Sequence, residues 1–343
     1  MDYEEKQHVQ DIIDIAIASI AIEQWKRLAG IVRDTDDRFY ALFSVEKALD
    51  SLRRLRLDGI PDYNDWDALF YLTWFQPNQI NIAYEVLSGL ENNLSYEDEQ
   101  GCGWNGNLFG LCDGKLRIVD FGCGALAMVF ALAVVAANAL SKGSKVTSIT
   151  VDCVDKSPAM VRIGQKAWYR FVDSLKTRHP DHPMCNIFSS IELHLHNHIN
   201  SLQDSPTLVP CFVSAIHCAY SDNVADVAHD MSVILDRFKP VAVFLTTHKK
   251  KEEVLDELSL GIDNKDYDPL LTIGRVDPFF RGNLPETTKL RKELSKHLLK
   301  PHDWLTKSGV DGGFIRDYLS SWSVKWTSPK GYTFHVYLRK NIH

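Results

Sequence analysis

Residues 116 to 130 read LRIVDFGCGALAMVF, an apolar run that meets an aspartate and two glycines before it becomes apolar again. The opening residues have the β-branched and aromatic composition of a buried strand. The apolar residues from Ala125 to Leu140 predict a buried helix, because they fall short of the roughly 20 residues of a membrane span. Gly122 and Gly124 therefore fill a tight strand-to-helix turn, where backbone N–H groups can approach a small polar ligand.

The bulk composition is that of a globular protein with a large core. The chain has 343 residues, of which 45% are hydrophobic, and a formal net charge of -7. This negative charge argues against a protein whose whole surface binds a polyanion. The first residues carry acids where a signal peptide needs positive charge, and the seven cysteines show no paired spacing. We expect a cytoplasmic protein with reduced thiols and no membrane segment, and the oligomeric state stays open.

The pattern of the chain changes after its first third. Residues 1 to about 95 have helical periodicity, and a loop rich in Gly and Asn follows them, so residues 1–112 predict a helical N-terminal domain or cap. Residues 113–343 alternate apolar strands with helices, which predicts an α/β domain with a mostly parallel, doubly wound sheet. A charged, mostly helical insertion is expected at about 249–318. The chain then closes with two apolar segments, residues 322–326 and 332–340, that predict an antiparallel C-terminal hairpin.

The glycine turn also fits a dinucleotide fingerprint. Gly122, Gly124 and Ala127 match the pattern G-x-G-x-x-A, which favours a nicotinamide or flavin ligand. Asp120 argues against this interpretation, because a carboxylate just before the turn gains nothing from an anionic pyrophosphate. A ligand that carries cationic groups would be stabilised there.

Several segments in series carry a resemblance to one family. IVDFGCGALA resembles the first motif of the class I S-adenosylmethionine-dependent methyltransferases, and VDCVDKSPAMVRIGQKAW is similar to the second, an acid at the end of the next strand. ELHLHNHINSL, CFVSAIHCAYSDN and ILDRFKPVAVFLTTH follow in the family's order. The resemblance covers roughly Leu116 to Lys340 apart from the insertion. It implies a Rossmann-like, seven-stranded sheet and S-adenosyl-L-methionine as cofactor, although Ala125 and Leu126 replace the usual glycine or proline.

The resemblance also implies roles for individual residues around the cofactor. Asp155 would accept hydrogen bonds from the ribose hydroxyls, with Asp152 as the alternative if the register is shifted. Asp120 would reach the amino end of the methionine portion. The remaining expected cofactor residues are Gly122 and Gly124 in the turn, Asn197 and His198 at the adenine, and Ser214 on the fourth strand.

The alternating histidines 194, 196 and 198 raise the question of a metal site, because a strand would place all three on one face. We expect no metal, since helices should cover the third strand and leave little room for open coordination.

The acceptor of the methyl group is less defined. His217 and Tyr220 follow the fourth strand, where the acceptor should meet the cofactor, and they are the candidate catalytic residues. The net charge favours a small-molecule or peptide acceptor. Five cations of the insertion leave an RNA (rRNA or tRNA) methyltransferase as an alternative: Lys289, Arg291, Lys292, Lys296 and Lys300. A non-catalytic scaffold and an NAD-binding protein are further alternatives.

Overall fold

The computed structural model of the chain describes the residues in the following ranges: 3–33, 51, 63–92, 107–204, 209–216, 224–248, 252–263, 266–270, 279–280, 284–298 and 332–340. Its helices are α1 (Tyr3–Arg33), α3 (Asp65–Trp74), α4 (Gln76–Glu91), α5 (Leu108–Leu111), α6 (Ala127–Ser141), α7 (Pro158–Arg178), α8 (Met184–Phe188), α9 (Val224–Phe238), α10 (Glu252–Asp263) and α11 (Pro285–Leu298), with a short 3₁₀ turn, η1 (Ile199–Ser201). Its strands are β1 (Lys115–Phe121), β2 (Ser148–Val154), β3 (Ile191–His196), β4 (Cys211–Ile216), β5 (Ala242–His248), β6 (Tyr267–Leu270) and β7 (Tyr332–Arg339).

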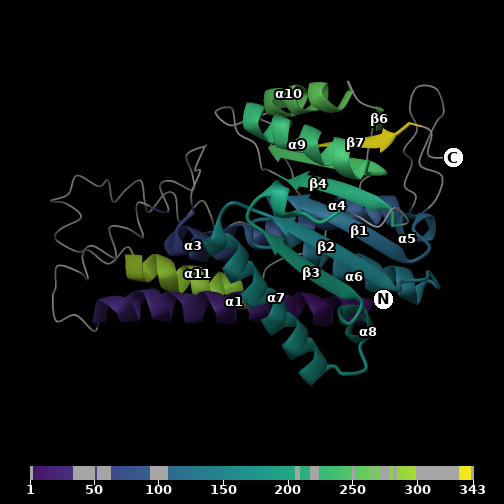
Figure 1. Ribbon diagram of the computed structural model, residues 1–343. Helices are drawn as coiled ribbons and strands as arrows, with labels where there is room; N and C mark the ends of the chain where they lie inside the picture. The colour runs from purple at the N-terminus through teal and green to yellow at the C-terminus, as the bar shows by residue number, and fades with distance from the viewer. Residues whose placement is uncertain are drawn as a thin grey trace.

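The strands form one seven-stranded sheet in the order β3-β2-β1-β4-β5-β7-β6 (Figure 1). The first five strands in chain order are parallel, and β7 runs antiparallel to both of its neighbours. β1 lies in the interior of the sheet, between β2 and β4, and its apolar residues are buried. The doubly wound, mostly parallel sheet with an antiparallel C-terminal strand is thereby confirmed.

The partner of the last strand differs from the expectation. Residues 322–326, which the pattern paired with it in a hairpin, lie outside the described residues. The described partner is β6, which comes from the segment assigned to a helical insertion. This segment therefore contributes a strand to the sheet as well as helices.

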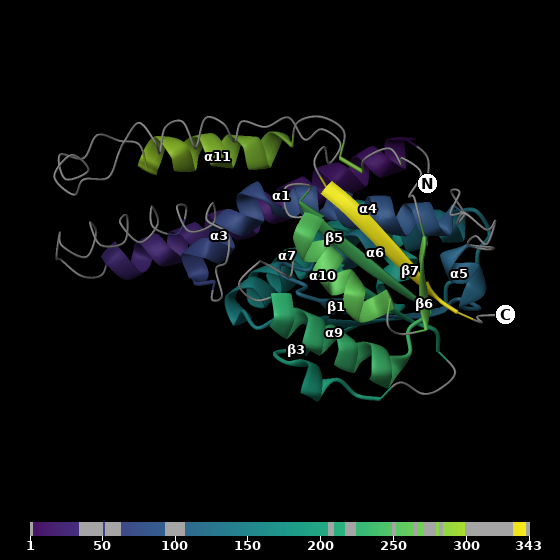
Figure 2. The ribbon, with the colours of Figure 1, turned by 90° about the horizontal axis from the view of Figure 1, so that it is seen from above.

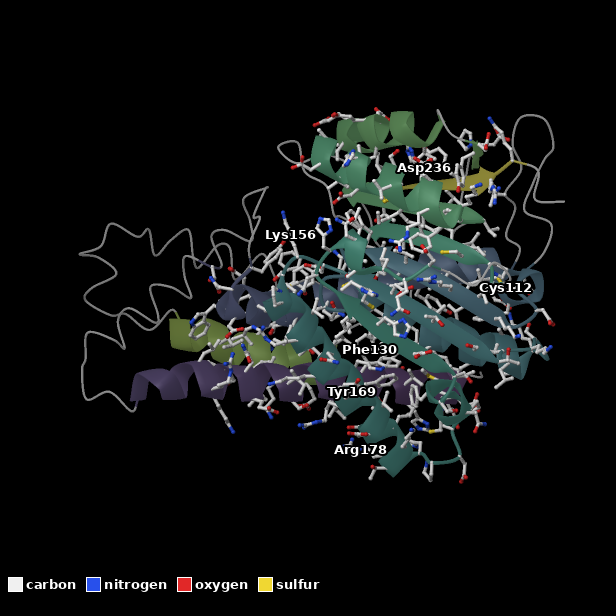
Figure 3. All side chains as sticks on the ribbon, in the orientation of Figure 1. Cys112, Phe130, Lys156, Tyr169, Arg178 and Asp236 are labelled. Carbon is white, nitrogen blue, oxygen red and sulfur yellow. The ribbon has the colours of Figure 1, made fainter. Side chains whose placement is uncertain are left out.

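Two layers of helices cover the sheet (Figures 1 and 2). One face carries α6, α7, α8 and the N-terminal helices, and the buried side chains between them form the larger hydrophobic core. Phe130 of α6 lies in this layer (Figure 3), in ring contact with Trp168 and Phe171 of α7. The opposite face carries α9 and α10, which pack on β4 and β5 through a second apolar cluster.

The N-terminal helices pack directly on the α/β part. α4 lies against α6, and α1 against α7, so both share the larger core. The interruption between α3 and α4 falls at Phe75, just before Pro77 in the first turn of α4, as expected for a proline that is tolerated only at a helix start. The division of the chain after residue 112 stays a prediction.

α11 lies beside α1 in both ribbon views (Figures 1 and 2), although about 250 residues separate the two helices along the chain. The buried carboxylate of Asp14 on α1 accepts hydrogen bonds from the backbone N–H groups of Glu286 (2.8 Å) and Thr287 (2.9 Å), and from the hydroxyl of Thr287. Asp14 therefore caps the N-terminus of α11 from another helix. No helix in the part of the chain that the structure describes is long and apolar enough to span a membrane.

Candidate functional site

The carboxyl ends of the parallel strands meet at one edge of the sheet. Lys156, which follows β2, lies at this edge in Figure 3, whereas Cys112, which precedes β1, lies at the opposite end. Ligands of open α/β sheets bind at the carboxyl edge, where the strand order reverses. In this chain the reversal lies between β1 and β4, beside the glycine turn.

The glycine turn connects β1 to α6 with three left-handed residues. Gly122, Gly124 and Leu126 have φ values of 74°, 51° and 66°. Glycine adopts such values without steric cost, whereas Leu126 is a non-glycine residue held there by burial. The N–H groups of Gly122 and Cys123 donate to the carbonyl of Val154 at 2.8 and 3.1 Å. The turn is therefore attached to the end of β2.

Helices from both parts of the chain hold the turn in place. A Cβ on Gly164 of α7 would lie 2.5 Å from the backbone of Ala125, so only glycine permits this approach. Gln76 of α4 donates from Nε2 to the carbonyl of Ala125 at 2.7 Å. A Cβ on Gly124 would lie 3.7 Å from the hydroxyl of Tyr71. Sequence reasoning missed these three supports, because their contacts join segments that are distant along the chain.

Asp155 fastens the turn to the start of α7. Its Oδ2 accepts from the N–H of Gly124 at 2.8 Å, and its Oδ1 accepts from the N–H of Ser157 at 2.7 Å. Burial raises the pKa of Asp155, while these two hydrogen bonds oppose the increase. A carboxylate offers about four acceptor positions, so hydrogen-bonding capacity remains for a ligand. Ser157, not Asp155, is the N-cap of α7.

Asp120 lies beneath the turn, on the same face of the sheet as the larger core. Its side chain is buried, and burial raises its pKa to about 7, with the charge of Asp155 adding to the increase and the hydroxyl of Ser214 opposing it. Ser214 is the register partner of Asp120 on β4. Its buried Oγ finds no hydrogen-bond partner of ordinary geometry among the described residues. Asp120 and Ser214 are therefore two adjacent buried polar groups with spare bonding capacity.

Asn197 and His198 also lie at the carboxyl edge. Both are exposed and follow β3 directly. The N–H of Asp155 donates to the carbonyl of His196 at 3.1 Å, which places the residues after β3 next to Asp155. The Nδ1 of His198 accepts from the N–H of Asn200, so His198 caps η1 while its ring remains exposed.

The structure thus brings together Asp120, Gly122, Gly124, Asp155, Asn197, His198 and Ser214 at one edge of the sheet. The candidate catalytic residues His217 and Tyr220 lie outside the described residues.

Two other expectations change. Asp152 is not an alternative ribose ligand, because its side chain lies on the opposite face, where it pairs with Arg117 at 2.6 Å. Helices do not enclose the third strand either: β3 is an edge strand, and the side chain of His194 is 41% exposed.

The basic residues of the insertion divide into different environments. Arg291 of α11 is buried, and its Nε and a terminal nitrogen donate to the carbonyl of Thr73 at 2.9 and 2.7 Å. Burial lowers its pKa to about 9, so it stays charged at neutral pH. Lys289 and Lys292 are exposed, beside Glu286 and Glu293. Arg291 therefore joins helices and is not available to a nucleic acid.

The geometry of the turn fits a small ligand with both cationic and hydroxyl groups. No described side chain caps the N-terminus of α6. The two glycines of the turn have positive φ and carry no side chain, and a buried carboxyl with a neighbouring hydroxyl lies next to them. A buried carboxyl is stabilised by an opposite charge, which an anionic pyrophosphate cannot supply.

No protein-family model matches the chain. No curated protein matches it either. Solved structures do. One is a geranyl diphosphate C-methyltransferase from Streptomyces coelicolor A3(2) in complex with magnesium, geranyl diphosphate and S-adenosyl-L-homocysteine, with 13% identity and a TM-score of 0.32 over 83% of this chain and 86% of that chain. Another is the methyltransferase domain of bacterial CtHen1, with 13% identity and a TM-score of 0.37 over 77% of this chain and 99% of that chain.

A third similar structure is a loganic acid methyltransferase with S-adenosyl-L-homocysteine, with 11% identity and a TM-score of 0.34 over 78% of this chain and 95% of that chain. At these low identities and TM-scores the likeness assigns neither a family nor a role to any residue of this chain. The strand order and the antiparallel β7 give a doubly wound, mostly parallel sheet of seven strands, as the sequence predicts.

Proposed function

We propose that the protein binds S-adenosyl-L-methionine at the glycine turn and transfers its methyl group to an acceptor. The observation that carries this proposal is the buried carboxyl of Asp120 at the end of β1, directly beneath the turn. S-adenosyl-L-methionine carries an ammonium and a sulfonium, and either positive charge compensates an ionised Asp120. A nicotinamide dinucleotide would bring two negative phosphates to the same place.

The other residues of the site have matching roles in the proposal. Gly122 and Gly124 allow the ligand to approach the backbone, and Ser214 supplies a hydroxyl beside Asp120. Asp155 accepts the ribose hydroxyls with the positions that its two backbone hydrogen bonds leave free. Asn197 and His198 contact the adenine from the end of β3.

The chemical step needs little from the protein beyond placement. Methyl transfer from a sulfonium proceeds when the acceptor lies in line with the bond that breaks, and exclusion of water strengthens the reactivity of the charged donor. In the proposal, His217 takes a proton from the acceptor or positions it, and Tyr220 contacts the acceptor.

We further propose a small molecule or a peptide as acceptor. The net charge of -7 opposes a long polyanion, and Arg291 is occupied by the carbonyl of Thr73. An RNA acceptor would make binding fall steeply with salt, because each neutralised phosphate releases counterions. The test is RNA retention over a salt series, for the intact chain and for a variant with Lys289 and Lys292 changed to Ser. Submicromolar retention at physiological salt that the variant loses would replace this acceptor class with RNA.

Calorimetry tests the cofactor directly. The full chain is titrated with S-adenosyl-L-homocysteine and, separately, with NAD. We expect binding of S-adenosyl-L-homocysteine with one equivalent and no measurable heat with NAD. Binding of NAD alone would overturn the proposal, as would equal binding of S-adenosyl-L-homocysteine by Asp120→Asn, since the buried carboxyl is the feature on which the proposal rests.

A further inference from the structure

A polar cluster lies on the face of the sheet opposite the glycine turn. Asp152 of β2 is buried, with a side chain 1% exposed, and its Oδ1 faces two imidazole nitrogens of β3. The Nδ1 of His194 lies 3.3 Å from this oxygen, and the Nε2 of His196 lies 3.0 Å from it. The three ligand atoms lie within 4.8 Å of one another.

In the neutral imidazole of His196, the surrounding hydrogen bonds leave Nε2 as the nitrogen that carries the lone pair. The hydroxyl of Ser201 donates to the carbonyl of His198 at 2.7 Å, so its oxygen accepts from the Nδ1 of His196 at 3.1 Å. A neutral imidazole carries only one N–H, and here Nδ1 holds it. The lone pair of Nε2 then faces a carboxylate oxygen 3.0 Å away, and either a second imidazole proton or a metal ion between the two atoms removes their repulsion.

His194 has an equivalent outer partner. Its Nε2 lies 3.0 Å from Oε1 of Glu192, which fixes the ring and directs Nδ1 toward Asp152. Metal-binding histidines usually donate their other ring N–H to a carboxylate, a hydroxyl or a carbonyl, and this outer partner determines which nitrogen binds the metal. Both histidines therefore have the surroundings of metal ligands.

The carboxylate is oriented in the same way. Arg117 of β1 holds Oδ2 through Nε at 2.6 Å, and its terminal nitrogen donates to the carbonyl of Gln203 at 2.8 Å. Its guanidinium also lies over the ring of Phe238, 4.9 Å from the centroid. These three contacts fix Arg117. Because Arg117 binds only Oδ2 of Asp152, Oδ1 remains available to face His194 and His196.

We propose that Asp152 Oδ1, His194 Nδ1 and His196 Nε2 form a binding site for a divalent transition-metal ion, with zinc as the expected ion and one coordination position open to solvent. With bonds of about 2.0–2.1 Å, neighbouring ligands of a tetrahedral zinc ion lie about 3.3–3.4 Å apart. The oxygen-to-nitrogen distance of 3.3 Å to His194 matches this spacing, and the distance of 3.0 Å to His196 is slightly shorter. Two imidazoles and one carboxylate suit zinc, whereas magnesium and calcium prefer oxygen ligands throughout.

The position on the sheet provides access. β3 is the edge strand, and the side chain of His194 is 41% exposed against 11% for His196. The site is independent of the proposed function, because none of its ligands belongs to the glycine turn.

Metal titration tests this site. The full chain, stripped by a chelator, is titrated with zinc chloride by calorimetry and with cobalt chloride by visible absorption, without S-adenosyl-L-methionine. We expect one tightly bound equivalent and the visible absorption of a cobalt ion with nitrogen ligands. His196→Ala should weaken binding at least a hundredfold, and Ser201→Ala about tenfold, because it removes only an outer partner.

His229→Ala, which removes an exposed histidine of α9, is the matched control and should bind as the original chain does. If His196→Ala fails to fold, as judged by circular dichroism, the half-exposed His194→Ala takes its place. Absence of a bound equivalent in the original chain overturns the proposal, as does equal binding by the histidine variant and the control.

Discussion

At the scale of single residues, Asp120 links stability to pH. Its pKa rises from 3.8 to about 7 on folding, so between pH 4 and 7 the folded chain holds a proton that the unfolded chain has lost. The free energy of unfolding therefore falls as pH increases through this window, by on the order of 4 kcal/mol at most. Asp120→Asn removes this dependence, so the variant should unfold at higher denaturant concentration than the original chain at pH 8 and at about the same concentration at pH 4.

The same substitution should harm binding. An ionised Asp120 attracts a cationic ligand, so the affinity for S-adenosyl-L-homocysteine, which keeps the ammonium, should increase between pH 6 and 8 and then level off. In Asp120→Asn the affinity should be lower and nearly independent of pH in this range. A parallel pH profile for the two proteins would contradict the placement of the ammonium at Asp120.

Asp155 has both a structural and a binding role, and two variants separate them. Asp155→Ala removes acceptors for Gly124 and Ser157 as well as for the ribose, and loss of charge-assisted hydrogen bonds costs about 1.5–3 kcal/mol. Calorimetry should show a tenfold to hundredfold weaker affinity for S-adenosyl-L-homocysteine. Ser157→Ala, which removes the N-cap of α7 and a long hydrogen bond to the carbonyl of Tyr63, should destabilise the chain by about 1 kcal/mol and leave the affinity unchanged.

At the scale of elements, the close approach of α7 to the glycine turn depends on Gly164. Replacing glycine by alanine in a helix interior normally stabilises the helix by about 0.5–1 kcal/mol. At position 164, however, the added Cβ would lie 2.5 Å from backbone atoms of Ala125. Such overlap typically costs about 1–3 kcal/mol, so Gly164→Ala should destabilise the chain on balance.

Gly261 of α10 supplies the matched control, because nothing lies within 4 Å of a Cβ added there. Gly261→Ala should stabilise the chain by up to about 1 kcal/mol. Urea unfolding of both variants measures the difference, and a stabilising Gly164→Ala would mean that α7 can move away from the turn without loss.

The elements that the sequence predicts well are those with a strong local pattern. β1, α6 and β2 follow from apolar runs and from the glycines between them, and the order of motifs places Asp120 and Asp155 at neighbouring strand ends. β6 escapes this reasoning because it has four residues, one of them Pro269, and gains its structure only by pairing with β7.

The residues of the candidate site also divide into those that a local sequence motif predicts and those that depend on contacts between distant segments. Gly122, Gly124 and Asp155 are visible in the sequence because each belongs to a local motif. Gln76 reaches the carbonyl of Ala125 across 49 residues, and no periodicity in either segment indicates that contact. The exposure of His194 could not be predicted from the local sequence either, because it depends on β3 being an edge strand of the sheet.

At the scale of the whole molecule, Asp14 joins the first helix to α11. Asp14→Ala would leave the N–H groups of Glu286 and Thr287 without their acceptor, and each buried unsatisfied group costs about 1–3 kcal/mol. The free energy of unfolding should fall by about 2–4 kcal/mol. Asp11→Ala, on the exposed side of the same helix, should change it by less than about 0.5 kcal/mol. Equal effects in a urea titration would show that α11 is held by apolar packing alone.

The packing of α1 also has a consequence for synthesis on the ribosome. Val9, Ile13 and Ile17 are buried between α1 and its neighbours, among them α11. About 250 residues are added between the end of α1 and the start of α11, which takes about 12–50 s at roughly 5–20 residues per second. Throughout this interval the part of α1 that packs on α11 is exposed to chaperones, whereas α3 and α7 are synthesised earlier and can cover the rest of the helix sooner.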